Sequence, residues 1–203
     1  MTAKQGSPDP TRDYSDFPAH TVAPDTVMYR SHGSFGAWYF CPDQGCRFDL
    51  EDPHGTCYTA TDVETAVREK LRDKITASGV VQYDEAAAFR ISKLTAPVAY
   101  DCAEVNAKTA SKYGVVRGIS SMDDYGVPQA WAKTLHGSGF GGIFYGSAYT
   151  NGAPTAYALF GPTGEPDPSA GFTAEEYLSG VDACAEVGIE VEDIPPPAGI
   201  MLI

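Results

Sequence analysis

Glycine and proline recur along the whole chain and limit how long any helix or strand can be. The 203 residues include 21 glycines and 15 prolines, and both residue types mark turns and the ends of regular elements. This distribution predicts many short elements rather than a helical bundle. A chain of this length also fits one domain with a full hydrophobic core better than two domains.

Strand-like and helix-like patterns are mixed along the chain. Residues 26–40 have the β-branched and aromatic content of strands, and residues 61–73 carry the apolar stripe of a helix. Residues 172–188 predict a late helix, because they open with the spacing of a capping box. Since no regular βαβ alternation is visible, the predicted class is α+β.

The two ends of the chain differ in composition. Residues 1–24 are polar and proline-rich, which predicts a disordered N-terminal lead-in. Residues 25–203 form the predicted folded domain. We see no apolar core of a secretory signal and no apolar run of the roughly 20 residues that cross a membrane. Five cysteines, an odd number, fit reduced thiols in a cytoplasmic protein.

The charge balance narrows the class of ligand. A formal net charge of −13 repels phosphodiesters and anionic membranes, so we expect neither direct nucleic-acid binding nor membrane binding. A small anionic ligand remains compatible with this charge if arginines gather in one cleft.

Three cysteines and a histidine within seventeen positions have the ligand types of a zinc site. The spacing Cys41-x4-Cys46-x7-His54-x2-Cys57 is irregular, however, because zinc ligands usually come in tight pairs. Cys57 also lies in a strand-like run, where its side chain would point away from Tyr58 and pack as a small apolar residue. We therefore expect no metal site, and a zinc-dependent nucleic-acid binder is a distant alternative.

Five polar residues remain as candidates for chemistry, and each alone is weak evidence. Their order and spacing resemble the RES domain family, which is named for its Arg, Glu and Ser. "MYRSHG" resembles the opening strand and supplies Arg30, while "CRFDLEDPHGTCYTA" is similar to the next segment and supplies Arg47 and Tyr58. "TDVETAVREKL" matches the following helix and supplies Glu69, and "GFGGIFYGSAYTNGAPTAYALF" resembles the late strand pair and supplies Ser147.

The resemblance covers about residues 26–165 and has two departures. Gly142 stands where the family pattern leads us to expect an acidic residue, and Ala148 follows the serine where a basic residue is common. The departures leave the Arg, Glu and Ser residues in place and put the substrate contacts in doubt.

The resemblance implies an enzyme that consumes NAD+, with a mixed or antiparallel sheet flanked by helices as in ADP-ribosyltransferase toxins. It implies cleavage of the nicotinamide–ribose bond by hydrolysis or phosphorolysis, with no cofactor and with inorganic phosphate as a co-substrate in the second case. Many members are bacterial toxins held inactive by a separate Xre-type antitoxin, so that partner and a homo-oligomer are expected.

The implied roles suit the chemistry of the five residues. Of the catalytic candidates, Glu69 would stabilise the positive charge that develops on the ribose, hold a ribose hydroxyl or orient the acceptor, and Arg30 would supply forked donors to the pyrophosphate or to an incoming phosphate. Ser147, the third catalytic candidate, would hydrogen-bond the substrate rather than attack it, since no base is visible beside it. As substrate-binding residues, Arg47 would supply forked donors to the pyrophosphate, and Tyr58 an aromatic face or a hydroxyl.

Two alternatives stay open. The protein could transfer ADP-ribose to a protein target, which the sequence does not distinguish from transfer to water or phosphate. It could also be a non-catalytic module that binds NAD+ in a retained pocket.

Overall fold

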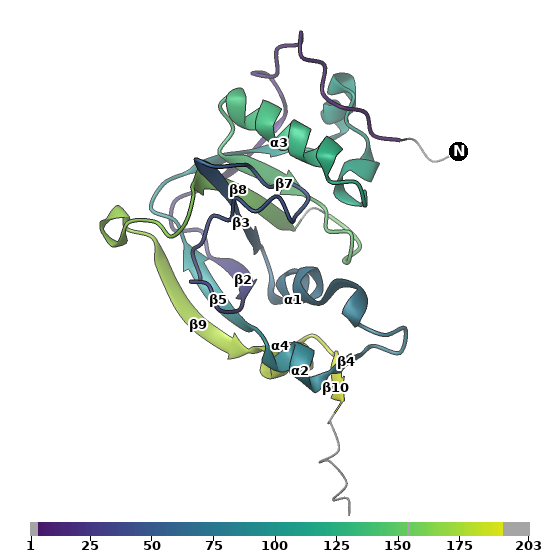
Figure 1. Ribbon diagram of the computed structural model, residues 1–203, viewed down its shortest axis with the longest axis vertical. Coiled ribbons are helices and arrows are strands. Elements are labelled where there is room, and N and C mark those ends of the chain that lie inside the picture. The colour runs from purple at the N-terminus through teal and green to yellow at the C-terminus, as the bar shows by residue number, and fades with distance from the viewer. Residues whose placement is uncertain (1–3, 154, 193–203) are drawn as a thin grey trace, which may run out of the picture.

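The protein has an α+β fold built on one large sheet, as a computed structural model covering residues 4–153 and 155–192 shows. The eight strands follow the order β1-β6-β7-β8-β3-β2-β5-β9 (Figure 1). In that order they are β1 (Ala19–Val22), β6 (Tyr100–Glu104), β7 (Gly142–Tyr145), β8 (Ala156–Pro162), β3 (His54–Ala60), β2 (Met28–His32), β5 (Arg90–Thr95) and β9 (Thr173–Ser179). The predicted α+β class is confirmed.

Neighbouring strands of this sheet run antiparallel except β6 and β7, which are parallel. A separate parallel pair joins β4 (Val80–Gln82) to β10 (Glu190–Glu192). The α-helices are α1 (Val63–Leu71), α2 (Tyr83–Ala87), α3 (Gly126–Gly137) and α4 (Gly180–Glu186). Four short 3-10 helices are η1 (Arg72–Lys74), η2 (Lys108–Tyr113), η3 (Arg117–Ser120) and η4 (Pro168–Ala170).

Helices cover two separate parts of the sheet. Figure 1 shows α3 beside β7 and β8, and α1, α2 and α4 together in the other half of the molecule. The buried apolar residues accordingly form one cluster around α3 and β7, another around α1, α2 and α4, and a third on the opposite face of the central strands. None of the helices within the described ranges has the length and apolar character needed to cross a bilayer.

Helix α1 forms where its apolar stripe was predicted. Asp62 caps its N-terminus, since the carboxylate accepts the backbone N–H of Thr65 at 2.7 Å. Val67 and Leu71 point into the core and are almost completely buried. The opposite side of α1 carries polar side chains, including Glu69, which face the neighbouring strands and loops.

The large sheet is nearly split between β2 and β3. One residue pair, Tyr29 with Ala60, joins these two strands, whereas β3 pairs with β8 along its entire length from His54 to Ala60. On the other side, β2 pairs with β5 along its own length. Beyond that single pair β2 and β3 diverge, and the backbone opens between the two halves of the sheet.

The N-terminal segment is ordered, so the prediction of a disordered lead-in is wrong for residues 4–24. Tyr14 and Phe17 are buried in the core around α3, and the Tyr14 ring meets the Trp131 ring edge to face at 5.4 Å. The side-chain amide of Gln5 donates to the carbonyl of Gly114 at 3.1 Å. The polar, proline-rich composition concealed a few aromatic anchors, whose burial outweighs the cost of ordering the segment.

The expected late helix over residues 172–188 is also wrong in its first half. Residues Thr173–Ser179 form β9, the edge strand that pairs with β5, and only Gly180–Glu186 are helical. Cross-strand contacts stabilise this pairing, since the Lys93 ammonium lies 3.7 Å from the centre of the Tyr177 ring. The capping-box spacing was a local pattern that tertiary pairing overrides.

Gly142 has no room for a side chain. A Cβ atom there would lie 2.8 Å from the Ala158 carbonyl oxygen and 3.0 Å from the Cys102 sulfur. The glycine that departs from the expected acidic residue is therefore a packing requirement of β7, because this strand is buried between β6 and β8.

Substitution of this glycine tests the packing account. We expect Gly142→Ala to lower the free energy of unfolding by ~1–3 kcal/mol, the usual range for overpacking a well-packed core. Gly137→Ala is the matched control, because no atom lies within 4 Å of the Cβ position at this end of α3, and it should leave stability unchanged or slightly raised. Urea unfolding measures both, and equal stability of the two variants would contradict the account.

Candidate functional site

A cavity of about 310 Å³ lies where β2 and β3 diverge. Its wall comes from β2, from the loop that precedes β3, from β3 itself, from α1 and from two tyrosines, Tyr125 and Tyr145. This site brings together segments that are far apart in the sequence, and a cavity of this size is in the range of small-molecule sites.

Four of the five sequence-predicted residues line this cavity: Arg30, Arg47, Tyr58 and Glu69. The fifth, Ser147, is not among the lining residues. It follows β7 and is 9% exposed, and its hydroxyl oxygen accepts the backbone N–H of Tyr149 at 2.9 Å. In this structure, the hydrogen bond of Ser147 therefore serves the conformation of the loop between β7 and β8.

Two charged groups in the cavity have buried atoms without hydrogen-bond partners. Across the described ranges, four buried side-chain polar atoms have no partner, and the two charged ones are Arg47 Nε and Glu69 Oε1. Burying an unpaired polar atom is costly. Both residues line the same cavity, so a bound ligand that accepts from Arg47 and donates to Glu69 would remove this cost.

The rest of the Arg47 side chain is held in place. One Nη2 hydrogen bond reaches the carbonyl of Met122 at 3.3 Å, and the guanidinium carbon lies 5.4 Å from the centre of the Tyr125 ring. Nε itself makes no hydrogen bond to the described part of the protein. The arginine is oriented before any ligand arrives.

The loop that carries Arg47 is anchored from two sides. The Tyr58 hydroxyl accepts the backbone N–H of Phe48 at 2.8 Å and donates to the buried Asp49 carboxylate at 2.8 Å. From α3, the Gln129 amide donates to the carbonyls of Gln44 and Cys46 at 2.8 and 2.9 Å. Burial raises the pKa of the Asp49 carboxyl, although the hydrogen bonds that it accepts oppose the rise.

Arg30 anchors the opposite rim. Its Nη1 donates to the carbonyls of Ala37 and Tyr39 at 2.7 and 3.2 Å and lies 3.0 Å from the Cys57 sulfur. All the hydrogen bonds of this guanidinium within residues 4–153 and 155–192 come from Nη1. Its Nε and Nη2 make no hydrogen bond within these residues.

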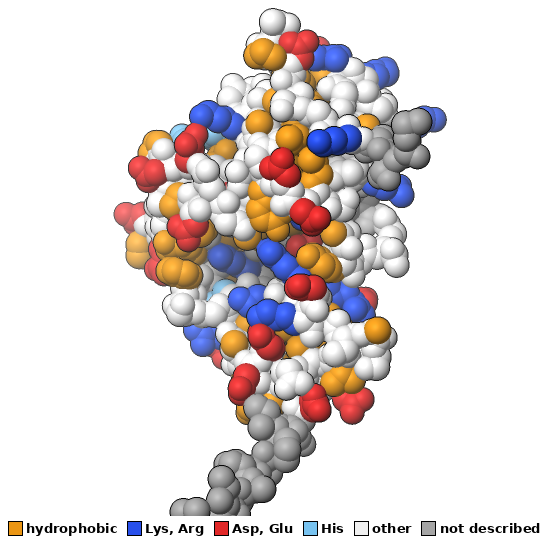
Figure 2. All heavy atoms as spheres, turned by 45° about the vertical axis from the view of Figure 1, so that its right-hand side comes forward, with side chains coloured by type: hydrophobic (Ala, Val, Ile, Leu, Met, Phe, Trp, Pro, Cys, Tyr) orange, Lys and Arg blue, Asp and Glu red, His pale blue; other side chains and the backbone are white. Residues whose placement is uncertain are grey.

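Although the protein is acidic overall, the cavity is lined by four basic and three acidic side chains: Arg30, Arg47, Lys70 and Arg72 against Asp43, Asp49 and Glu69. None of the three cavity arginines, Arg30, Arg47 and Arg72, has a carboxylate within 4.0 Å in the part of the chain that the structure describes. Burial, followed by the charges of Lys74, Arg72 and Arg30, lowers the pKa of Lys70 at the rim. Figure 2 shows Lys and Arg side chains gathered at mid-height on this face. The arrangement favours an anion.

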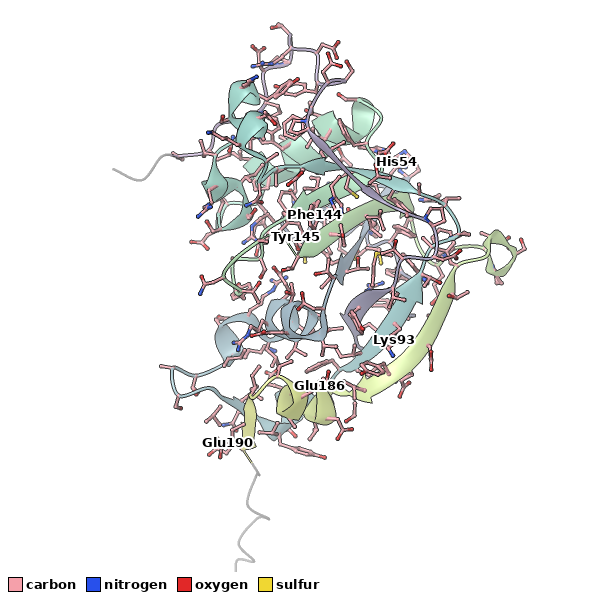
Figure 3. All side chains as sticks on the ribbon, turned by 180° about the vertical axis from the view of Figure 1, so that it is seen from behind. His54, Lys93, Phe144, Tyr145, Glu186 and Glu190 are labelled. Atoms are coloured by element: carbon pink, nitrogen blue, oxygen red, sulfur yellow. The ribbon has the colours of Figure 1, made fainter. Side chains whose placement is uncertain are left out.

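Three cavity residues were not predicted from the sequence. Arg72 lies three positions after Glu69, a spacing that could have placed both on one side of the chain. Tyr125 precedes α3 and carries no sequence signal. Tyr145 lies next to Phe144 on β7 (Figure 3), and alternation places Tyr145 on the cavity side and Phe144 in the cluster on the other face. Burial, and next the charge of Glu69, raise the pKa of Tyr145.

The residues with zinc-ligand chemistry do not come together. Cys57 is completely buried behind the sheet, whereas the His54 ring packs against the His136 ring at 4.6 Å. Among the described residues no three His, Cys, Asp or Glu side chains form a group that could hold a metal ion. Burial raises the pKa of the Cys41 thiol to about 11, so this cysteine is a weak nucleophile at neutral pH.

The double role of the Tyr58 hydroxyl leads to a stability prediction. Tyr58→Phe removes the partner of the Phe48 N–H and of Asp49, and we expect the free energy of unfolding to fall by ~1–3 kcal/mol. Tyr83→Phe is the control, because this tyrosine is 44% exposed and its loss should change stability by less than ~0.5 kcal/mol. Chemical denaturation compares them. An unchanged stability of Tyr58→Phe would mean that the hydroxyl does not anchor the loop.

Comparison with known proteins now gives the family. A sequence profile described as "RES domain" matches residues 27–177, whereas no curated protein sequence matches the chain. Among solved structures, the MbcT toxin in the crystal structure of the M. tuberculosis MbcT–MbcA toxin–antitoxin complex has a TM-score of 0.61 and 13% identity, over 83% of this chain and 92% of that chain. At this identity the structural similarity establishes the fold alone. Because the profile matches most of the chain, the protein belongs to the RES domain family.

Proposed function

We propose that this protein cleaves the nicotinamide–ribose bond of NAD+, with water or inorganic phosphate as the acceptor, and acts as the toxin of a toxin–antitoxin pair. The observation that carries the proposal is the pair of unpartnered buried atoms, Arg47 Nε and Glu69 Oε1, in one cavity lined by unpaired guanidinium groups. A ligand that satisfies both must present a hydrogen-bond acceptor to Arg47 and a hydrogen-bond donor to Glu69, and an anionic oxygen and a hydroxyl group meet these needs. The diphosphate and the ribose of NAD+ present these groups next to each other.

The bond that breaks joins ribose C1′ to the pyridinium nitrogen. Its electron pair goes to that nitrogen, so nicotinamide leaves as a neutral molecule and needs no proton. Positive charge develops on the ribose, and the Glu69 carboxylate would stabilise this charge or hold a ribose hydroxyl. The acceptor oxygen then bonds to C1′, and water loses its proton to solvent.

The remaining residues would position the substrate. Arg30 and Arg47 line the cavity on segments anchored by several hydrogen bonds, so they would bind diphosphate oxygens with little rearrangement. The Tyr58 ring would form one wall, since its hydroxyl is already engaged. Ser147 is expected to act through the loop that it stabilises, although the family resemblance gives it a direct substrate contact.

The toxin role rests on relatedness. The similar structure is the toxin of a toxin–antitoxin complex, and this chain shares its fold and belongs to the RES domain family. By that analogy a separate antitoxin would control the activity, because an enzyme that depletes NAD+ harms the cell that makes it.

Two variants test the assignment. Arg30→Ala or Glu69→Gln should reduce nicotinamide release from NAD+ at least a hundredfold, because the first removes a group that binds the diphosphate and the second a group that stabilises the reacting ribose. Glu69→Gln should keep or raise the melting temperature, since it removes a buried charge with an unpartnered oxygen. Arg68→Ala is the control and should retain activity, because Arg68 pairs with Glu64 and does not line the cavity.

Chromatography of NAD+ incubated with the purified protein, with and without inorganic phosphate, measures these rates. Nicotinamide with ADP-ribose indicates water as acceptor, and a phosphorylated ADP-ribose that forms only with phosphate indicates phosphorolysis. Full activity in both active-site variants would contradict the assignment of the site. Intact NAD+ together with measurable binding would contradict the enzymatic proposal and favour a binding module.

A further inference from the structure

The cavity contains a third arginine to which neither the family resemblance nor the proposed reaction assigns a role. We propose that Arg72 is a substrate-binding residue that holds phosphate oxygens, either those of the NAD+ diphosphate or those of free inorganic phosphate acting as acceptor. This inference rests on the proposed function, since it assigns a further part of the same cavity. Three independent features of Arg72 support it: its backbone, its contacts and its lack of an ion-pair partner.

The backbone of Arg72 has an unfavourable conformation for an arginine. Its φ and ψ are 52° and −126° at the end of α1, where its N–H donates to the carbonyl of Arg68. With ψ at −126° this conformation lies outside the left-handed helical region, and residues other than glycine adopt it at an energetic cost. Such strain tends to persist at functional sites, because a glycine could end the helix but could not supply the side chain.

The side chain is directed into the cavity by two contacts. Nε donates to the backbone carbonyl of Glu69 at 3.1 Å, and Nη2 lies 3.5 Å from the sulfur of Cys46. Cys46 is the neighbour of Arg47, so the Arg72 guanidinium lies between the end of α1 and the loop that carries Arg47. The contact to the Glu69 carbonyl fixes Arg72 relative to the catalytic candidate on the same helix.

The charge of Arg72 is not neutralised by the protein. Its side chain is partly buried, and within the described ranges no carboxylate lies within 4.0 Å of it. A partly buried guanidinium without a counter-ion is a strong site for an oxyanion, since its forked donors match two phosphate oxygens. Arg68, one turn earlier in the chain, differs in this respect, because its guanidinium pairs with the Glu64 carboxylate at 2.9 Å.

The two phosphate sources predict different effects. If Arg72 holds the diphosphate, it would act together with Arg47 on the dinucleotide before bond cleavage. If Arg72 holds the acceptor, it would place inorganic phosphate near Glu69 and C1′. Both cases require the same phosphate oxygens at the same guanidinium, and separate binding constants distinguish them.

The first test variant, Arg72→Gly, removes the guanidinium and also the backbone strain of an arginine at positive φ. Arg72→Gly is compatible with positive φ, so the melting temperature should stay the same or rise while phosphate binding is lost. Arg72→Asn is a second variant, which removes the charge and keeps a polar side chain at this position. Arg68→Ala is the matched control for loss of an arginine from the same helix.

Calorimetry with ADP-ribose and, separately, with inorganic phosphate measures binding, and steady-state kinetics give KM for NAD+ and for phosphate. We expect Arg72→Gly and Arg72→Asn to weaken one of the two ligands at least tenfold and to raise its KM, with a smaller change in kcat. Weaker ADP-ribose binding identifies the diphosphate, and weaker phosphate binding identifies the acceptor. Arg68→Ala should bind both as the parent does.

The outcomes separate this inference from the proposed reaction. If the parent protein leaves NAD+ intact but Arg72→Gly still loses affinity for ADP-ribose or phosphate, Arg72 binds phosphate oxygens although the reaction is wrong. If both Arg72 variants fold and bind the two ligands with the affinity of the parent, the inference is overturned whatever the parent does to NAD+.

Discussion

The divergence of β2 from β3 is the feature on which the site depends. One residue pair joins these strands, whereas each pairs fully with its other neighbour. Had they paired along their length, the backbone groups of both strands would be satisfied by the sheet and the side chains between them would be packed. The opening instead leaves a cavity between two well-formed halves, each stabilised by its own apolar cluster. Each half therefore has an apolar core of its own, and the cavity lies between the two.

The charged side chains of the cavity determine which class of ligand it favours. The chain is acidic, with a formal net charge of −13, yet the groups that converge here include three arginines without carboxylate partners in the described part of the chain. Burying guanidinium groups without ion-pair partners, and the Glu69 oxygen without a hydrogen-bond partner, lowers the folding stability. An arrangement of this kind is pre-organised for a ligand with anionic and hydroxyl groups, since the donors and acceptors need not move.

The sequence allowed much of the site to be predicted because motif order carries information about it. Arg30, Arg47, Tyr58 and Glu69 belong to segments whose order and spacing resemble the RES domain, and all four line one cavity. The alternation of Cys57 and Tyr58 on one strand was also predictable, and the two side chains lie in different clusters. The alternation of side chains along a strand is set by the local backbone, so it can be predicted without knowing the rest of the fold.

Other features depend on contacts that no local pattern contains. The N-terminal segment is ordered because Tyr14 and Phe17 pack near Trp131. Strand β9 forms because its backbone pairs with β5. The position of Ser147 outside the cavity depends on the path of a loop. Arg72 could not be singled out from the sequence, because its positive φ and its lack of an ion-pair partner in the described residues arise only in the folded chain.

A crystal structure of the Glu69→Gln variant with bound NAD+ tests the central claim most directly, because this variant should bind the dinucleotide without consuming it. We predict NAD+ in the cavity between β2 and β3, with Arg47 Nε donating to a diphosphate oxygen and the side chain at position 69 within hydrogen-bond distance of the ribose that carries nicotinamide. NAD+ in the larger cavity of about 600 Å³ between residues 49–54 and α3, or NAD+ in the proposed cavity with Arg47 Nε still unpartnered, would contradict the account.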